Sequence, residues 1–128
     1  MGMADFNWVK ARAACSLEVL FRQLQVVAEG DVETAKELPD KVRSGAKFEL
    51  SSGGGRFIVT RQQENGDVHN VKFILEKAQI VVDKGAGVTF TAKPSLNTEG
   101  ACKLRVRSAD LELWQVCRMA LEDLIFGK

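Results

Sequence analysis

Near the N-terminus, hydrophobic side chains recur every three to four residues, which is typical of an amphipathic helix. Between residues 5 and 28 they form one line, at Phe6, Val9, Ala13, Leu17, Leu20, Leu24 and Val27. A second line, at Trp8, Cys15, Val19 and Val26, makes the apolar stripe wider than a contact with one sheet requires. We therefore expect a long N-terminal helix that is covered on a second side by another helix or by a second subunit.

Glycine and proline divide the next part of the chain. Gly30 is expected to end the long helix in a left-handed conformation, and Asp31 is expected to cap a shorter helix, VETAKEL. Pro39 then stops this second helix. The helical N-terminal segment is thus predicted to extend over residues 5–38.

From residue 46 onward, hydrophobic and polar side chains alternate with a period of two, which is typical of strands. Strands are predicted near residues 46–51, 56–63, 68–76, 79–83, 87–92 and 101–107, with a longer connection at KPSLNTEG. Glycine and asparagine separate most of these segments by short turns. The pattern predicts an antiparallel meander of about five to six strands.

The turn at Asn65-Gly66 determines the register of one hairpin. A three-residue loop over residues 64–66 pairs Val59 with Val71 and Phe57 with Phe73. A two-residue turn would shift the register by one residue and turn Phe57 and Val59 toward solvent. We therefore predict the three-residue loop, with its glycine in the left-handed conformation.

This register predicts one apolar and one mostly polar sheet face, as in many antiparallel sheets. The apolar face is formed by Phe48, Leu50, Phe57, Val59, Val71, Phe73, Leu75, Ile80, Val82, Val88, Phe90, Cys102, Leu104 and Val106. The opposite face is polar except at Ile58, Ile74 and Val81.

A C-terminal helix is predicted over residues 109–126, with Ser108 as its N-cap and Asp110 and Glu112 in its first turn. Its apolar side chains cover more than half of its circumference, and Trp114 is interpreted as a core anchor. The expected fold is a single α+β domain over residues 1–128. The sheet spans residues 46–107, and the long N-terminal helix and the C-terminal helix lie side by side on its apolar face.

The three glycines at residues 53–55 are compared with a phosphate-binding loop, which leads from a strand into the N-terminus of a helix. Here the following segment, RFIVTR, alternates as a strand. The glycines are therefore predicted to form a hairpin connection. The alternative is a flexible edge loop that contacts a partner through its backbone and Arg56.

Catalytic signatures are sparse. His69 is the only histidine and is expected at the surface, tyrosine is absent, and the carboxylates fall mainly on predicted helix surfaces and turns. We expect no enzyme activity, no cofactor and no metal site. The net charge of +1 and the pI of about 7.7 favour neither nucleic acid nor an anionic membrane as partner.

Cysteine usage and the N-terminal sequence bear on the compartment. Cys15, Cys102 and Cys117 are scattered without a CxxC pair, so we expect small buried hydrophobic side chains instead of a disulfide or a zinc site. The segment MGMADFNWVKARA lacks the basic and apolar regions of a secretory signal, and no apolar run is long enough to cross a bilayer. Together with the composition, these features predict a cytoplasmic protein similar to small intracellular bacterial domains.

Two groups of side chains on the polar sheet face are candidates for binding. Lys103, Arg105 and Arg107 share this face and, with Arg56, are candidate contacts for phosphate or an acidic partner. Glu49, Glu76 and Asp83 are candidates to neutralise this basic row. No aromatic side chains interleave it, which disfavours nucleic acid.

The second group is Ile58, Ile74 and Val81, which we interpret as a candidate interface. The leading hypothesis is a non-enzymatic protein-binding or assembly module that self-associates as a dimer. As an alternative, the outline of a sheet closed by long helices resembles helix-grip lipid carriers, which implies a cavity for a small apolar ligand between helices and sheet. The meander followed by a helix with a tryptophan also resembles a pleckstrin-homology-like roll, although the long leading helix departs from that pattern.

Overall fold

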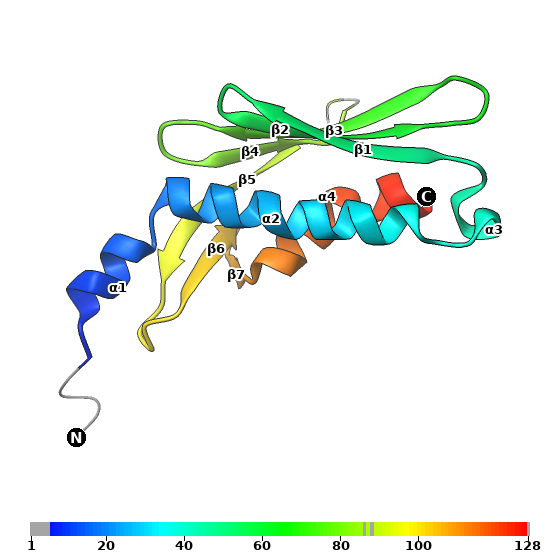
Figure 1. The fold of residues 1–128 in the computed structure, drawn as a ribbon. Helices are drawn as coiled ribbons and strands as arrows, with labels where there is room; N and C mark the ends of the chain where they lie inside the picture. The colour runs from blue at the N-terminus through cyan, green and yellow to red at the C-terminus, as the bar shows by residue number, and fades with distance from the viewer. Residues whose placement is uncertain (1–5, 86, 88, 128) are drawn as a thin grey trace.

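The computed structural model describes residues 6–85, 87 and 89–127. Within these residues the chain forms four helices and seven strands. Two helices, α2 (Leu17–Lys36) and α4 (Leu113–Phe126), lie side by side on one face of the sheet (Figure 1). The predicted α+β fold is confirmed, and the sheet has slightly more strands than expected.

The strands follow one another in the sheet in the order in which they occur in the chain, and each pairs antiparallel with the next. They are β1 (Lys47–Gly53), β2 (Arg56–Gln62), β3 (Val68–Leu75), β4 (Ile80–Asp83), β5 (Thr89–Leu96), β6 (Cys102–Val106) and β7 (Ala109–Leu111). β5 leads away from the layer formed by β1–β4, so that β6 and β7 lie beside the helices (Figure 1). β5 includes the start of the connection predicted at KPSLNTEG, and only residues 97–101 remain as the turn into β6.

The register derived from the sequence is confirmed. Val59 lies opposite Val71 and Phe57 opposite Phe73. The loop over residues 64–66 is closed by a hydrogen bond from the Gln63 N–H to the Asp67 carbonyl, and its glycine has a φ of 95°. The glycines at residues 53–55 also form a hairpin connection, because β1 turns directly into β2 there.

The predicted apolar sheet face forms the core. Of the residues expected there, Val88 lies outside the described residues, and Leu50, Leu75 and Cys102 are half-buried. The others are buried. Phe57 and Phe73 stack with ring centroids 4.3 Å apart, and the Phe21 ring of α2 lies 5.3 Å from that of Phe57. These three aromatic rings join α2 to the middle of the sheet.

The N-terminal segment forms two helices, α1 (Trp8–Ala14) and α2, where one long helix was predicted. Helix α1 ends at Cys15, and the Ser16 side chain caps α2 by accepting a hydrogen bond from the Val19 N–H at 3.2 Å. The predicted end at Gly30 is wrong, because α2 continues to Lys36. Buried side chains continue on both sides of this glycine, at Ala28, Val32 and Ala35. Their burial outweighs the roughly 1 kcal/mol that a glycine costs within a helix.

Two further segments differ from the prediction. A short helix, α3 (Asp40–Arg43), follows Pro39. The segment after Ser108 is a strand, because β7 pairs with β6 and the Asp110 carboxylate contacts the Arg105 guanidinium at 2.7 Å. Helix α4 therefore begins only at Leu113, where Glu112 takes the capping role predicted for Ser108 and forms a capping box with Gln115.

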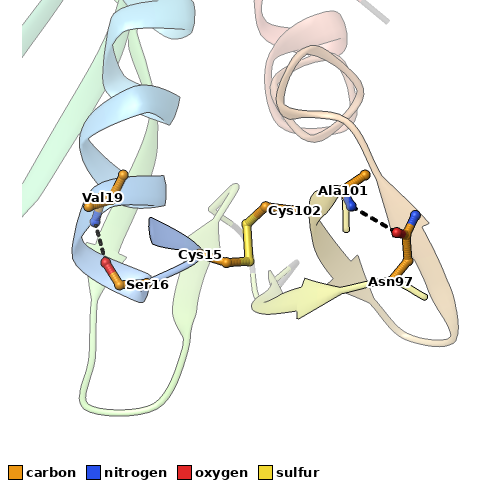
Figure 2. The surroundings of a disulfide bond; sticks show 6 residues. All are labelled: Cys15, Ser16, Val19, Asn97, Ala101 and Cys102. Carbon is orange, nitrogen blue, oxygen red and sulfur yellow. Dashed lines mark hydrogen bonds between the residues drawn. A yellow bond between two sulfur atoms is a disulfide. The ribbon is translucent and has the colours of Figure 1, made fainter. Parts of the chain in front are cut away.

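Cys15 and Cys102 form a disulfide bond, which corrects the prediction that the cysteines are only small buried hydrophobes (Figure 2). The two residues are 87 positions apart in the sequence, yet their Cα atoms are 5.5 Å apart. Sequence spacing gives no indication of such a pair, because the fold alone brings the start of α2 to β6. Disulfides are typical of oxidising compartments, so this bond does not support the predicted cytoplasmic location, which stays a prediction. Cys117 is free and buried, as expected.

The C-terminal end of α4 is held by Arg61, a buried side chain on the core face of β2. Its guanidinium donates hydrogen bonds to the carbonyls of Leu124 and Ile125 at 2.9 and 2.8 Å. It also donates to the Arg43 carbonyl at 3.2 Å and lies over the Phe48 ring. A cation at the last carbonyls of a helix is favourable because the helix dipole places negative charge there.

Candidate interaction surface on the helix layer

A groove of about 370 Å³ lies between α2 and α4. Among the described residues, its lining comes from α2, from Leu38, which follows α2, and from α4, and includes no strand residue. Leu121 and Ile125 form its floor together with Ala35, and all three are buried. The groove is thus a mostly apolar channel between two helices, different from the predicted cavity between helices and sheet.

Two aromatic side chains stand at this groove. Trp114 is 57% exposed and Phe126 is 58% exposed. The prediction that Trp114 is a core anchor is therefore wrong. The side of α4 that faces the core is formed by Val116, Ala120 and Leu124. Trp114 lies on a different side of the helix, which borders the groove and is open to solvent. The signal for this position was present in the sequence, since the apolar arc of the helix is wider than one core-facing stripe.

Burial affects the two titratable groups inside the groove. The pKa of the Asp31 carboxyl is raised by burial. The pKa of the Cys117 thiol is raised to about 12, first by burial and then by the negative charge of Asp31. The Cys117 thiol contacts the Leu24 carbonyl at 3.8 Å. Because the thiolate is the nucleophile, a thiol in this environment is unreactive.

Charged side chains line the outer side of the groove. The Arg118 guanidinium donates to the Glu122 carboxylate at 3.1 Å, which largely neutralises both groups. Among the described residues, Asp31 forms no ion pair within the chain. Its carboxylate is therefore the uncompensated charge of the groove.

A second apolar surface lies on α1. This helix has no buried residue, and it exposes Trp8 and Val9 by 65% and 58%. The expected coverage of the N-terminal helix on two sides is therefore wrong for this part, as it is for Val26, which is 64% exposed. Phe6 packs its ring against Gly100 in the β5–β6 turn, where a Cβ atom would collide with the ring. The α1 segment is thus fixed to the protein at its start by Phe6 and at its end by the disulfide.

The predicted sheet-face cluster is brought together by the fold. Ile58, Ile74 and Val81 lie on the neighbouring strands β2, β3 and β4, with Ile74 opposite Val81. Ile58 lies opposite Lys72, diagonal to Ile74. All three side chains are half-buried, so they offer less apolar surface than the tryptophans.

The predicted basic row is partly neutralised by neighbouring carboxylates. Lys103 pairs with Glu112, and Arg105 pairs with Asp110. The hydrogen bond from Arg105 lowers the pKa of the Asp110 carboxyl, and the same contact raises the pKa of the Arg105 guanidinium.

The neutralising carboxylates differ from those predicted, because they come from β7 and the cap of α4, a region expected to be helix throughout. Arg107 lies exposed in the β6–β7 turn with a φ of 59°, and Arg56 starts β2. Four strand spacings, roughly 19 Å, separate β2 from β6. The four basic residues therefore do not form one patch.

Other chemistry is limited in the part of the chain that the structure describes. His69 is exposed, as expected. In residues 6–85, 87 and 89–127, no three side chains of the metal-binding types come together as a metal site. Within the same ranges, none of the helices is both long and apolar enough to cross a membrane.

The fold and surface define an α+β protein with an antiparallel meander and an apolar groove in its helix layer. Comparisons of the chain with family models, curated proteins and solved structures found no match.

Proposed function

We propose that the protein is a non-enzymatic assembly module that self-associates as a dimer through its helix layer. The observation that carries this proposal is the exposed Trp114 at the edge of an apolar groove. Tryptophan is enriched among the residues that dominate binding energy at protein interfaces, where neighbouring side chains exclude water. Exposed apolar patches with a charged rim are characteristic of protein interaction sites.

The helix layer is favoured over the sheet face because of the size of the exposed side chains. Trp114 and Phe126 each expose more than half of their surface. Ile58, Ile74 and Val81 are smaller and half-buried. An interface centred on the sheet would therefore bury less apolar area per residue, and area removed from water drives association.

The groove volume supports a second candidate function. About 370 Å³ lies within the usual range for small-molecule sites, and the lining of this groove is mostly apolar. A small apolar ligand is therefore the alternative occupant. Its binding would make the protein a carrier, with the site between two helices instead of between helices and sheet.

Native mass spectrometry, combined with sedimentation velocity over a range of concentrations, separates these functions. We expect a wild-type dimer without added mass, a monomer for Trp114→Asp, and a dimer for the matched control Val68→Asp. Val68 is 53% exposed at the start of β3 and is not one of the residues that line the groove. A wild-type monomer with a bound small molecule would establish the carrier function instead. A dimer lost in Ile58→Lys and Ile74→Lys but kept in Trp114→Asp would place the interface on the sheet.

A further inference from the structure

We propose that the groove between α2 and α4 receives helix α1 of a second copy of this chain, and that two such contacts form a reciprocal dimer. This inference rests on the proposed self-association and names the segment that occupies the groove. It starts from two unpartnered apolar surfaces on one chain. One is the convex surface of α1, and the other is the concave groove.

Helix α1 cannot reach the groove of its own chain. The disulfide from Cys15 and the Ser16 cap hold α1 at the start of α2. The groove begins near Asp31, toward the other end of α2. At 1.5 Å per residue, the distance along the helix axis from Leu17 to Asp31 is about 21 Å. Figure 1 shows that α1 leads away from the layer of α2 and α4 at the N-terminal end of α2. Only a second molecule can therefore supply α1 to the groove.

The shape of α1 fits a groove between two helices. Trp8 and Arg12 are four residues apart and share one side of the helix, and Val9 and Ala13 lie beside them. Ala11, on the other side, is half-buried against the protein. The free side of α1 is thus apolar with one basic group. The seven residues of α1 are about 10 Å long, and the α4 wall from Trp114 to Phe126 is about 18 Å long, so the helix can lie along this wall over its whole length.

The charges of the two surfaces are complementary. Helix α1 carries Lys10 and Arg12 and no acidic residue. The groove carries Asp31, which forms no ion pair among the described residues, and Glu122, which is shared with Arg118. A basic helix placed here supplies a counter-charge to Asp31, whose burial would otherwise be unfavourable. An acidic partner helix would instead add like charges.

A two-fold arrangement doubles the effect of each tryptophan. Trp8 and Trp114 are 65% and 57% exposed, and each occurs twice in a reciprocal dimer. With roughly 150–250 Å² for each aromatic side chain, of which about six-tenths is exposed here, these four side chains supply on the order of 500 Å², about a third of the ~1,600 Å² of a standard interface. The remaining area comes from Val9, Phe126 and the adjoining helix surfaces.

The decisive experiment mixes two variants that each fail to dimerise. Trp8→Asp damages α1 and leaves the groove intact, whereas Trp114→Asp damages the groove and leaves α1 intact. We expect each substitution alone to weaken the dimer by at least about 30-fold, the effect of losing one dominant interface residue. In an equimolar mixture, one intact helix can enter one intact groove. The mixture should therefore form a heterodimer with one working contact, detected by its mass in native mass spectrometry.

Each outcome decides one part of the argument. A wild-type monomer at all concentrations overturns both the proposed function and this inference. A Trp8→Asp protein that dimerises like wild type overturns this inference and leaves self-association intact. If both variants are monomeric and the mixture also stays monomeric, the pairing of helix with groove is wrong. Both side chains are exposed, so circular dichroism spectra equal to that of wild type serve as the check on folding, with Val68→Asp as the matched control.

Discussion

Replacing Arg61 by methionine tests the account of how α4 is held on the sheet. The substitution keeps a long, flexible apolar side chain and removes the guanidinium. In the wild type, this group donates to the carbonyls of Leu124 and Ile125 at 2.9 and 2.8 Å and to the Arg43 carbonyl at 3.2 Å. These carbonyls belong to the last turn of α4 and to the end of α3, where intrahelical partners are lacking.

The magnitude follows from the hydrogen bonds. A hydrogen bond to a charged donor contributes about 1.5–3 kcal/mol, and two of the bonds from Arg61 are short and well buried. The variant also removes a buried charge, which offsets part of this loss. We therefore expect the free energy of unfolding to fall by about 3 kcal/mol. Arg61→Lys keeps the charge but lacks the planar fork that reaches several carbonyls, so it should lose less.

Urea unfolding, followed by circular dichroism, measures this change. Arg105→Met is the matched control, because it removes an arginine whose ion pair with Asp110 lies at the surface. Exposed pairs contribute about 1 kcal/mol or less, so the control should unfold close to wild type. A loss below about 1 kcal/mol in Arg61→Met, or an equal loss in both variants, would refute the assigned role.

Three other changes should be measurable. Replacing both Cys15 and Cys102 by alanine should lower the free energy of unfolding by about 2–5 kcal/mol, because the disulfide closes a loop of 87 positions. The wild type in reductant should match the variant, and an unchanged urea midpoint in the variant would contradict the prediction. The pKa of the Cys117 thiol is raised from 9.0 to about 12, so between these values the folded state keeps a proton that the unfolded state loses. The free energy of unfolding should therefore fall as pH rises from 9.0 to about 12, and it should fall less steeply in Cys117→Ala; equal slopes in both proteins would contradict this prediction. Gly30→Ala should raise stability by about 1 kcal/mol, since nothing lies within 4 Å of the added Cβ; a decrease in thermal midpoint would disprove it.

The sheet was predictable because its signals are local. Alternation of side chains and one turn with a left-handed glycine determine the register of β2 and β3, and the whole apolar face follows from that register. Helix boundaries were less predictable because local preferences compete with burial. Gly30 and Ser108 have the properties of helix ends, yet packing carries α2 through Gly30, and strand pairing includes the residues after Ser108.

The features that depend on long-range contacts were missed. Cys15 and Cys102 pair only because the fold brings α2 to β6. Arg61 was not singled out, although the confirmed register places it on the core face beside Val59. The sequence shows that the apolar stripes of the helices are wider than one contact with the sheet requires. It does not show which of these apolar side chains stay exposed to solvent. Trp114 was assigned to the core for that reason.

The position of the tryptophans connects the fold with the proposed assembly. The chain has two tryptophans, and folding leaves both more than half exposed. A helix on a sheet buries one stripe against the sheet and one flank against its neighbour, so side chains on the remaining arc gain nothing from folding. Trp8 stands on a helix with no buried residue, which Phe6 and the disulfide nevertheless hold in one orientation. Holding α1 in place adds little to the core, but it lowers the conformational entropy lost when the helix docks into a partner, which is how preorganisation increases affinity.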